Sequence, residues 1–337
     1  MKIHQNKSLA PFNTFAIDVK AEYFAEFSTP DELVALLRTG IRPARVMGGG
    51  SNLLLTQDLE GLTLRNRIEG LAVIPRTDKV TWVNVGAGVD WNRLTEWAVQ
   101  NNLGGIENLS LIPGSVGAAP IQNIGAYGVE LKDVFVSLKA LDIETLKIRH
   151  FTRPACRFGY RDSLFKREAK GRFIILTVCL KLARGSAHRL KLDYGDIRRT
   201  LQAYGIPNPG IADVARAVID IRRSKLPDPK VLPNSGSFFK NPEISATAFE
   251  ALKKRYPQIP HYPAPEGRVK VPAGWLIEQC GWKGKRIGDA GCHERQALVL
   301  VNYGRASGRD ILRLAELIQT SVGNHFGIDL EPEVNRW

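Results

Sequence analysis

Residues 113–128 read PGSVGAAPIQNIGAYG and form the most informative segment of the sequence. It holds four glycines and no charged residue. Glycine lets a ligand approach the main chain, while Gln122 and Asn123 offer amide hydrogen bonds beside Tyr127. Packing of a loop against a helix would explain the glycines but not the amides, the tyrosine and the missing charge. We therefore expect a wall, here called the small-residue wall, against which a flat polar ring such as a flavin can lie.

A second glycine-rich segment, Gly48-Gly49-Gly50-Ser51-Asn52, lies upstream of the wall. Its backbone N–H groups can form a nest that suits a pyrophosphate. Taken alone, a triple glycine favours a tight turn between strands, because short glycine motifs often occur by chance. No P-loop or Rossmann motif is present, since Gly86-Ala87-Gly88 lacks the third glycine. Considered together with the small-residue wall, the segment indicates a bound cofactor.

The composition is that of a globular protein with two or three domains, because 44% of the 337 residues are hydrophobic and 24% are charged. The chain has 47 lysines and arginines against 34 aspartates and glutamates, which gives a net charge of +13. This charge favours anionic partners, which can be nucleic acids or phosphorylated metabolites. Four widely spaced cysteines favour a reducing compartment. No apolar leader or bilayer-length apolar run occurs, so we expect a cytoplasmic protein without membrane insertion.

Caps and hydrophobic periodicity predict the main elements. Thr29 as N-cap, Pro30 at the first helical position and Glu32 predict a helix that runs to Gly40. Apolar spacing predicts further helices over 90–100, 211–225 and 307–323. Strands are expected over 44–47, 81–88, 134–143, 146–151 and 173–183. Turn-favouring residues over 204–234 indicate the boundary to a last domain.

Four motifs in order give the sequence a specific resemblance. PGSVGAAPIQNIGAYGVE at 113–130, CRFGYRDSLFK at 156–166, NSGSFFKNP at 234–242 and LEPEV at 330–334 resemble the UDP-N-acetylenolpyruvoylglucosamine reductase family. Tyr194 in DYGDI resembles the type I form, which bears a tyrosine loop. The resemblance implies an α+β fold with a two-domain FAD-binding scaffold of the vanillyl-alcohol-oxidase (PCMH) type, in subdomains 1–66 and 67–213. A third α+β domain, 214–337, would bind substrate.

The same resemblance implies a bacterial flavoenzyme of peptidoglycan synthesis. Such an enzyme uses NADPH and noncovalent FAD to reduce the enolpyruvyl ether of UDP-N-acetylglucosamine to UDP-N-acetylmuramate. Negative charge must accumulate on the substrate carboxylate, and Arg161 offers a planar cationic fork that can stabilise it. The resemblance makes Ser237 the proton donor. It makes Glu333 the third catalytic residue, which we expect to act as a protonated acid, because an ionised carboxylate would repel the developing charge.

Two sets of binding residues follow from the motifs and the resemblance. We expect FAD to contact the glycine nest and the small-residue wall, through Gly48, Gly49, Gly50, Ser51, Asn52, Pro113, Gly114, Ser115, Gly117, Ala118, Ile121, Gln122, Asn123, Gly125, Ala126, Tyr127 and Gly128. The resemblance assigns the nucleotide sugar and NADPH to Tyr194, Lys225, Asn241 and Gln296. Both ligands are anionic, so we expect them to bind in turn over one face of the flavin. Alternate binding predicts ping-pong kinetics. We also expect the protein to be a monomer. Cys292 beside His293 does not form a zinc motif, and we assign no metal.

Two other functions remain open at this point. A flavin oxidase could share the FAD scaffold, although no histidine near Gly48–Asn52 could carry a covalent flavin. A nucleic-acid-binding protein would explain the positive charge, but the lysines and arginines are spread along the chain rather than interleaved with aromatic residues. The absorption spectrum separates a flavoprotein, which is yellow, from a colourless nucleic-acid-binding protein. An oxidase should turn over with an alcohol and oxygen without NADPH, whereas the reductase requires NADPH.

Overall fold

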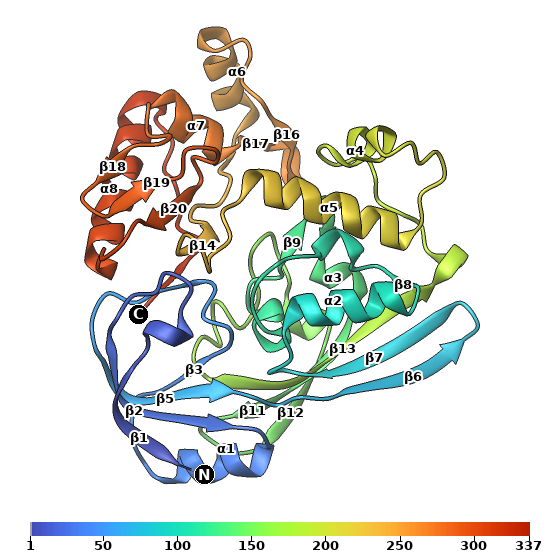
Figure 1. Cartoon of the computed structure of the whole chain (residues 1–337), viewed down its shortest axis with the longest axis vertical. Coiled ribbons are helices and arrows are strands. Elements are labelled where there is room, and N and C mark those ends of the chain that lie inside the picture. Colours follow the sequence, from blue (N-terminus) through green and yellow to red (C-terminus); the bar gives the residue numbers. More distant parts are fainter. Residues whose placement is uncertain (1) are drawn as a thin grey trace. The chain divides into compact units, whose positions relative to one another are not determined.

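The computed structural model describes residues 2–337 (Figure 1), and the chain divides into two compact units. Unit 1 contains the described residues up to Lys7 together with Ala21–Gly49 and Glu60–Ser224. Unit 2 contains Ser8–Lys20, Gly50–Leu59 and Lys225–Trp337. Two short segments from the amino-terminal part of the chain therefore belong to the same unit as the carboxyl-terminal third.

The first sheet of unit 1 has the strand order β1-β2-β5-β3. These strands are β1 (Ile3–Ser8), β2 (Lys20–Phe27), β5 (Leu59–Asn66) and β3 (Ala44–Met47), and β3 runs parallel to β5. Helix α1 (Pro30–Arg38) packs its buried leucines against this sheet. The Thr29 side chain accepts the N–H of Glu32 at 3.2 Å, so the predicted cap is confirmed. The helix ends at Arg38 rather than Gly40.

The second sheet of unit 1 is antiparallel and six-stranded, in the order β12-β11-β13-β7-β6, with β8 (Leu103–Gly104) beside the end of β13. Its members are β6 (Leu71–Thr77), β7 (Val80–Gly86), β11 (Phe135–Asp142), β12 (Ile148–Thr152) and the long β13 (Phe173–Arg184). Helix α2 (Trp91–Gln100), which Figure 1 shows along this sheet, buries Trp91, Leu94 and Ala98 in the same core as Val83 and Val85. The strands and the helix predicted from the sequence are confirmed here.

Short elements connect this sheet to the remainder of unit 1. The small-residue wall includes the 3₁₀ helix η3 (Val116–Ile121) and strand β9 (Gly125–Ala126), which pairs with β10 (Val129–Glu130). Around it are η2 (Glu107–Leu109), α3 (Leu131–Val134), η4 (Pro154–Cys156) and η5 (Gly185–Ala187). Helices α4 (Ile197–Ala203) and α5 (Ile211–Lys225) share a small core against which Tyr127 of the wall packs.

Unit 2 is built on a four-stranded sheet with the order β14-β20-β19-β18. The strands are β14 (Asn234–Ser237), β18 (Arg286–Ile287), β19 (Ala290–Cys292) and β20 (Val299–Asn302). Helix α8 (Gly308–Phe326) packs beside this sheet and contacts α7 (Ala273–Gln279), and Ser307 caps α8 through a capping box. The predicted helix over 307–323 is confirmed and extends to Phe326.

The rest of unit 2 consists of short elements. A three-stranded sheet combines β15 (Glu243–Ile244), β17 (Val269–Lys270) and β16 (Tyr262–Pro263), next to α6 (Ala246–Arg255) and η6 (Pro265–Gly267). The amino-terminal segments contribute η1 (Ala10–Phe12) and β4 (Leu53–Leu54). Strand β21 (Asn335–Arg336) pairs in parallel with β4, which ties the end of the chain to the segment after the triple glycine. Within residues 2–337, none of the helices combines the length and apolar character needed to cross a membrane.

Candidate functional site

The two glycine-rich segments meet in unit 1. Gly48 and Gly49 follow β3, and a Cβ on Gly48 would lie 2.2 Å from Ser115 Oγ. A Cβ on Gly49 would lie 3.0 Å from the Cα of Gly114. Only residues without side chains allow the two backbones to approach so closely. The structure thus brings together two parts of the predicted cofactor site that are more than sixty positions apart in sequence.

The remainder of the predicted nest, residues 50–52, belongs to unit 2. Its glycine, Gly50, is needed for a different structural reason. Gly50 has φ +65°, and a Cβ there would lie 1.9 Å from the carbonyl oxygen of Phe12. Gly50 is therefore required by packing against the amino-terminal segment. Asn52 donates from Nδ2 to the carbonyl oxygen of Glu333 at 3.2 Å, and its own carbonyl accepts the Asn335 N–H at 3.1 Å. Asn52, a predicted cofactor residue, thus lies beside Glu333, a predicted catalytic residue.

The far end of the small-residue wall contacts the tyrosine loop. The rings of Tyr127 and Tyr194 meet edge to face, with their centroids 6.4 Å apart. Gly128 follows Tyr127 with φ +78°, a backbone conformation that favours glycine. Asn108 donates at 2.9 Å to the carbonyl oxygens of both Tyr127 and Lys191, so one buried amide joins the wall to the chain that leads to Tyr194. Tyr194 itself is 43% exposed and can face a ligand.

Arg161 lies at a tight turn in which the Gly159 N–H donates to the Asp162 carbonyl at 3.0 Å. Its backbone is left-handed, with φ +53°. The guanidinium donates from Nη2 to the carbonyl oxygen of Gly125 at 2.5 Å. Ser163 Oγ donates to the Ile121 carbonyl at 2.7 Å. The predicted electrophile therefore contacts the small-residue wall through its own charged group.

The side chain of Asn123, predicted to contact the cofactor, has internal partners. It is fully buried and donates from Nδ2 to the Gly159 carbonyl oxygen at 2.9 Å. Its Oδ1 accepts the backbone N–H of Lys132, also at 2.9 Å. Gln122, the adjoining amide, is half-buried. The side chains of these two neighbouring residues therefore differ in burial. The sequence alone does not indicate this difference.

Ser237 and Glu333 lie close together in unit 2. Ser237 ends strand β14, opposite Val299 of β20, and follows Gly236, whose φ is +69°. The Glu333 N–H donates at 2.8 Å to the carbonyl oxygen of Phe238, the residue after Ser237. Both side chains belong to half-buried residues. Backbone pairing of LEPEV with NSGSFFKNP thus brings together two predicted catalytic residues that are 96 positions apart in sequence.

The other predicted substrate residues of unit 2 are held locally. Asn241 accepts the N–H of Ala273 on Oδ1 at 2.9 Å, at the start of α7. Gln296 accepts the N–H of Leu298 on Oε1 at 3.4 Å, in the turn before β20. Lys225 is the last residue of α5 and is exposed. Both amide groups are therefore oriented by the backbone before any ligand binds.

Sequence reasoning missed Arg222 on α5. The residue is half-buried, and its Nε is fully buried without a hydrogen-bond partner in residues 2–337. Burial lowers the pKa of the guanidinium, and the nearby Tyr127 opposes this shift. Helical spacing could have identified this residue. Arg222 follows the buried Val218 by four positions, so both lie on the same face of the helix. A guanidinium whose Nε is buried without a hydrogen-bond partner suits an anionic ligand, because an unsatisfied buried polar group is costly.

The residues present fit FAD. The small-residue wall offers half-buried or exposed positions with little side chain, including Gly117, Ala118 and Gly128, and it carries no acidic group that would repel a phosphate. A flat ring can therefore reach the main chain, with the Arg161 guanidinium on the same wall. Within residues 2–337, no three metal-binding side chains are grouped.

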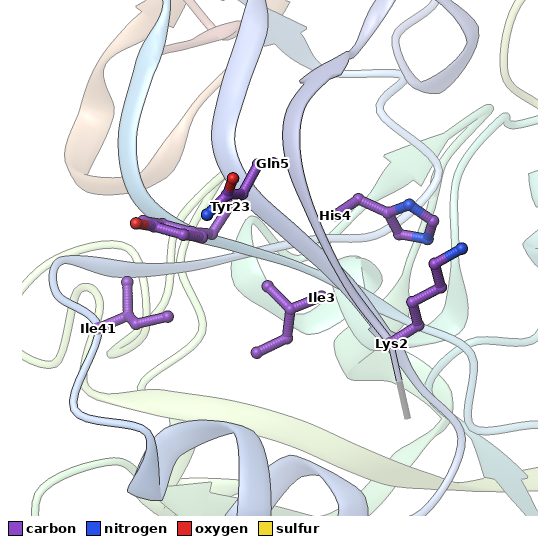
Figure 2. A pocket seen from close by; sticks show the side chains of 6 residues that line it. All are labelled: Lys2, Ile3, His4, Gln5, Tyr23 and Ile41. Atoms are coloured by element: carbon purple, nitrogen blue, oxygen red, sulfur yellow. The ribbon is translucent and has the colours of Figure 1, made fainter.

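A separate pocket of about 510 Å³ lies at the β1–β2 edge of unit 1 (Figure 2). It contains none of the predicted site residues. Its lining consists of Lys2, Ile3, His4, Gln5, Tyr23 and Ile41.

Comparison with known proteins gives consistent results along the chain. Residues 228–337 match the C-terminal domain of UDP-N-acetylenolpyruvoylglucosamine reductase, and residues 21–151 match an FAD binding domain. The chain is 51% identical over 338 residues to the UDP-N-acetylenolpyruvoylglucosamine reductase of Pseudomonas aeruginosa, with 99% of each chain covered. Identity to the reductase of Flavobacterium johnsoniae is 49% over 336 residues, again with 99% of each covered.

A solved structure agrees with these matches. The UDP-N-acetylenolpyruvylglucosamine reductase from Thermus caldophilus aligns with a TM-score of 0.69 at 25% identity, covering 100% of this chain and 99% of that one. The expected fold class is confirmed: an α+β chain in which an FAD-binding scaffold precedes a separate carboxyl-terminal domain.

Proposed function

Because the chain belongs to the UDP-N-acetylenolpyruvoylglucosamine reductase family, we propose that it reduces the enolpyruvyl ether of UDP-N-acetylglucosamine to UDP-N-acetylmuramate, a step of peptidoglycan synthesis. FAD is the bound cofactor and NADPH is the hydride donor. The observation that carries this proposal at the level of residues is the contact between Arg161 and the small-residue wall. This contact supports the proposal because it brings a permanent cation to the wall against which we expect the flavin ring to lie.

The reaction adds a hydride to one alkene carbon and a proton to the other, and NADPH is oxidised to NADP⁺. Bound FAD supplies the two-electron hydride chemistry. The Gly48–Asn52 segment would hold the pyrophosphate of FAD, and the small-residue wall would hold its ring. Arg161 stabilises the negative charge that develops on the substrate carboxylate.

Ser237 and Glu333 complete the proposed chemistry. Ser237 Oγ gives its proton to the second alkene carbon and recovers one from solvent. Glu333, the third catalytic residue, orients the carboxylate end of the substrate. The structural support is their shared backbone pairing, in which Glu333 bonds to the residue after Ser237.

We assign the binding of the two anionic ligands to one aromatic, one basic and two amide side chains. Tyr194, Lys225, Asn241 and Gln296 bind the nucleotide sugar and NADPH in turn, and the net charge of +13 favours both ligands. We infer a cytoplasmic monomer that binds neither nucleic acid nor membrane. We propose a division into 1–66, 67–213 and 214–337, and the family match at 228–337 lies within the last of these domains.

The test of the proposed function is spectroscopic. The purified protein should be yellow, with oxidised flavin that is released by denaturation and is therefore noncovalent. Anaerobic NADPH should bleach it, and the enolpyruvyl nucleotide sugar should restore the colour. Oxygen-dependent turnover of an alcohol without NADPH would identify an oxidase instead, and a colourless protein that binds RNA with strong salt dependence would identify a nucleic-acid-binding protein.

Arg222 provides a prediction about both stability and binding. We assign its guanidinium to an anionic group of the nucleotide sugar or of NADPH. Arg222→Met should raise the free energy of unfolding of the substrate-free protein by about 1 kcal/mol, because it removes a buried cation without a partner at Nε. It should weaken substrate binding roughly tenfold, since a charge-assisted hydrogen bond is lost.

The matched control is Arg223→Met, which changes the adjoining exposed arginine. Thermal unfolding and calorimetric titration with substrate measure the two effects, and the control should show neither. A destabilised Arg222→Met protein with unchanged substrate affinity would give Arg222 a purely structural role.

A further inference from the structure

Three hydrogen bonds fasten the turn that carries Arg161 to the small-residue wall. Asn123 Nδ2 donates to the Gly159 carbonyl at 2.9 Å, Ser163 Oγ donates to the Ile121 carbonyl at 2.7 Å, and Arg161 Nη2 donates to the Gly125 carbonyl at 2.5 Å. Residues 159–163 are therefore joined to residues 121–125 at three points. Two of these bonds come from side chains that are at most 2% exposed.

Asn123 is the most constrained member of this arrangement. It is fully buried, and its Oδ1 accepts the Lys132 N–H at 2.9 Å, at the first turn of α3. A backbone N–H can only donate and a carbonyl can only accept, so the two partners fix which end of the amide faces each of them. The orientation of the amide is thus set by α3 on one side and by the Arg161 turn on the other.

The Arg161 turn needs such support because its backbone is unfavourable. Arg161 has φ +53° and Asn123 has φ +45°, both in the left-handed region. A residue with a Cβ seldom adopts this region unless surrounding contacts hold it there. Asparagine tolerates it better than most residues, whereas arginine has no such preference. Relaxation of the turn would displace the guanidinium from Gly125.

We propose that Asn123 is a positioning residue for Arg161: through the Gly159 carbonyl it holds the Arg161 turn, and hence the guanidinium, in the place required by the substrate carboxylate. This proposal rests on the proposed function, in which Arg161 stabilises the charge on that carboxylate. Asn123 acts through the protein, because its side chain is fully buried and both ends of its amide are hydrogen-bonded to the backbone. Its contribution belongs to the step in which substrate is reduced and not to the step in which NADPH reduces the flavin.

A double-mutant cycle tests the proposal on the flavin-loaded enzyme, using stopped-flow measurement of each half-reaction. Asn123→Ala should slow flavin reoxidation by substrate about 100-fold, because small displacements of a catalytic group have effects of this size. Reduction by NADPH should stay within about twofold. In an Arg161→Ala background, Asn123→Ala should cause no further loss of the reoxidation rate, since the group it positions is absent.

Asn66→Ala is the matched control, because Asn66 is also buried in unit 1, donates to the Ile175 carbonyl and accepts the Ile68 N–H. It should lower stability without changing the ratio of the two half-reaction rates. Amide hydrogen exchange supplies a readout independent of turnover. Exchange over residues 157–164 of the purified protein should rise in Asn123→Ala and not in Asn66→Ala.

The outcomes separate the proposal from the proposed function. If Arg161→Ala leaves reoxidation unchanged, the assignment of Arg161 fails. If Arg161→Ala slows reoxidation but Asn123→Ala slows both half-reactions equally, or multiplies the loss in the Arg161→Ala background, the positioning role is overturned. If Asn123→Ala does not fold, Ser163→Ala is tested instead. It removes the hydrogen bond from Ser163 Oγ to the Ile121 carbonyl, which holds the same turn. An unchanged reoxidation rate in that variant would overturn the proposal as well.

Discussion

Replacement of Arg161 by methionine slows the reoxidation of the reduced flavin by substrate about 10²–10³-fold, while reduction of the flavin by NADPH is retained. This is the expected result if Arg161 stabilises the developing negative charge on the carboxylate, since loss of one such donor costs about 3–4 kcal/mol in the transition state. NADPH carries no carboxylate that gains charge as its hydride leaves, so the first half-reaction does not need the guanidinium. Stopped-flow absorbance of the flavin measures both rates.

Two further variants make the Arg161 result specific. Arg161→Lys keeps the charge but loses the planar fork, so it should recover only part of the lost rate. Arg167→Met is the control, because Arg167 is close in sequence, largely exposed and paired with Asp162 of the same turn. Its surface ion pair contributes little to stability, and both half-reactions should proceed normally. Equal slowing of both half-reactions in Arg161→Met would mean that the cofactor site itself had been damaged.

The helices and strands with local signals could be predicted from the sequence. Thr29 and Pro30 mark the start of α1, and the apolar spacing over 211–225 defines α5 to the residue. Short strands such as β4, β18 and β21 could not be predicted, because their pairing is set by distant partners. The parallel pairing of Asn335 with Leu53 depends on contacts nearly three hundred residues apart.

The site was predictable in its residue types but not in its internal contacts. Glycine motifs indicate positions where another group can lie close to the backbone. They do not indicate whether that group is a ligand or another part of the protein. Gly48 faces Ser115, whereas Gly50 packs against Phe12 for structural reasons. In the same way, the amide of Asn123 looks like a ligand contact in sequence, but burial and its two hydrogen bonds assign it to the Arg161 turn. Arg222 was missed because a charged residue on an apolar helical face is easily read as solvent-exposed.

Ser237→Ala should slow reoxidation of the flavin by substrate about 10²–10⁴-fold, the usual contribution of a positioned proton donor. Reduction by NADPH transfers only a hydride, so the first half-reaction should be unaffected. Ser237→Cys should keep part of the activity, because a thiol can also supply a proton and its ordinary pKa is near 8.5. The wild-type enzyme should show a solvent deuterium isotope effect on reoxidation and none on flavin reduction.

Ser235→Ala is the control that lies on the same strand. Ser235 is buried, and its Oγ lies 3.3 Å from Thr14 Oγ1, so its loss should lower stability without changing the ratio of the two rates. The comparison separates chemistry from folding because both substitutions remove one hydroxyl from β14 two residues apart. If Ser237→Ala behaves like Ser235→Ala, the proton must come from another group. The backbone pairing that brings Glu333 beside Phe238 would then make Glu333 the next donor to test.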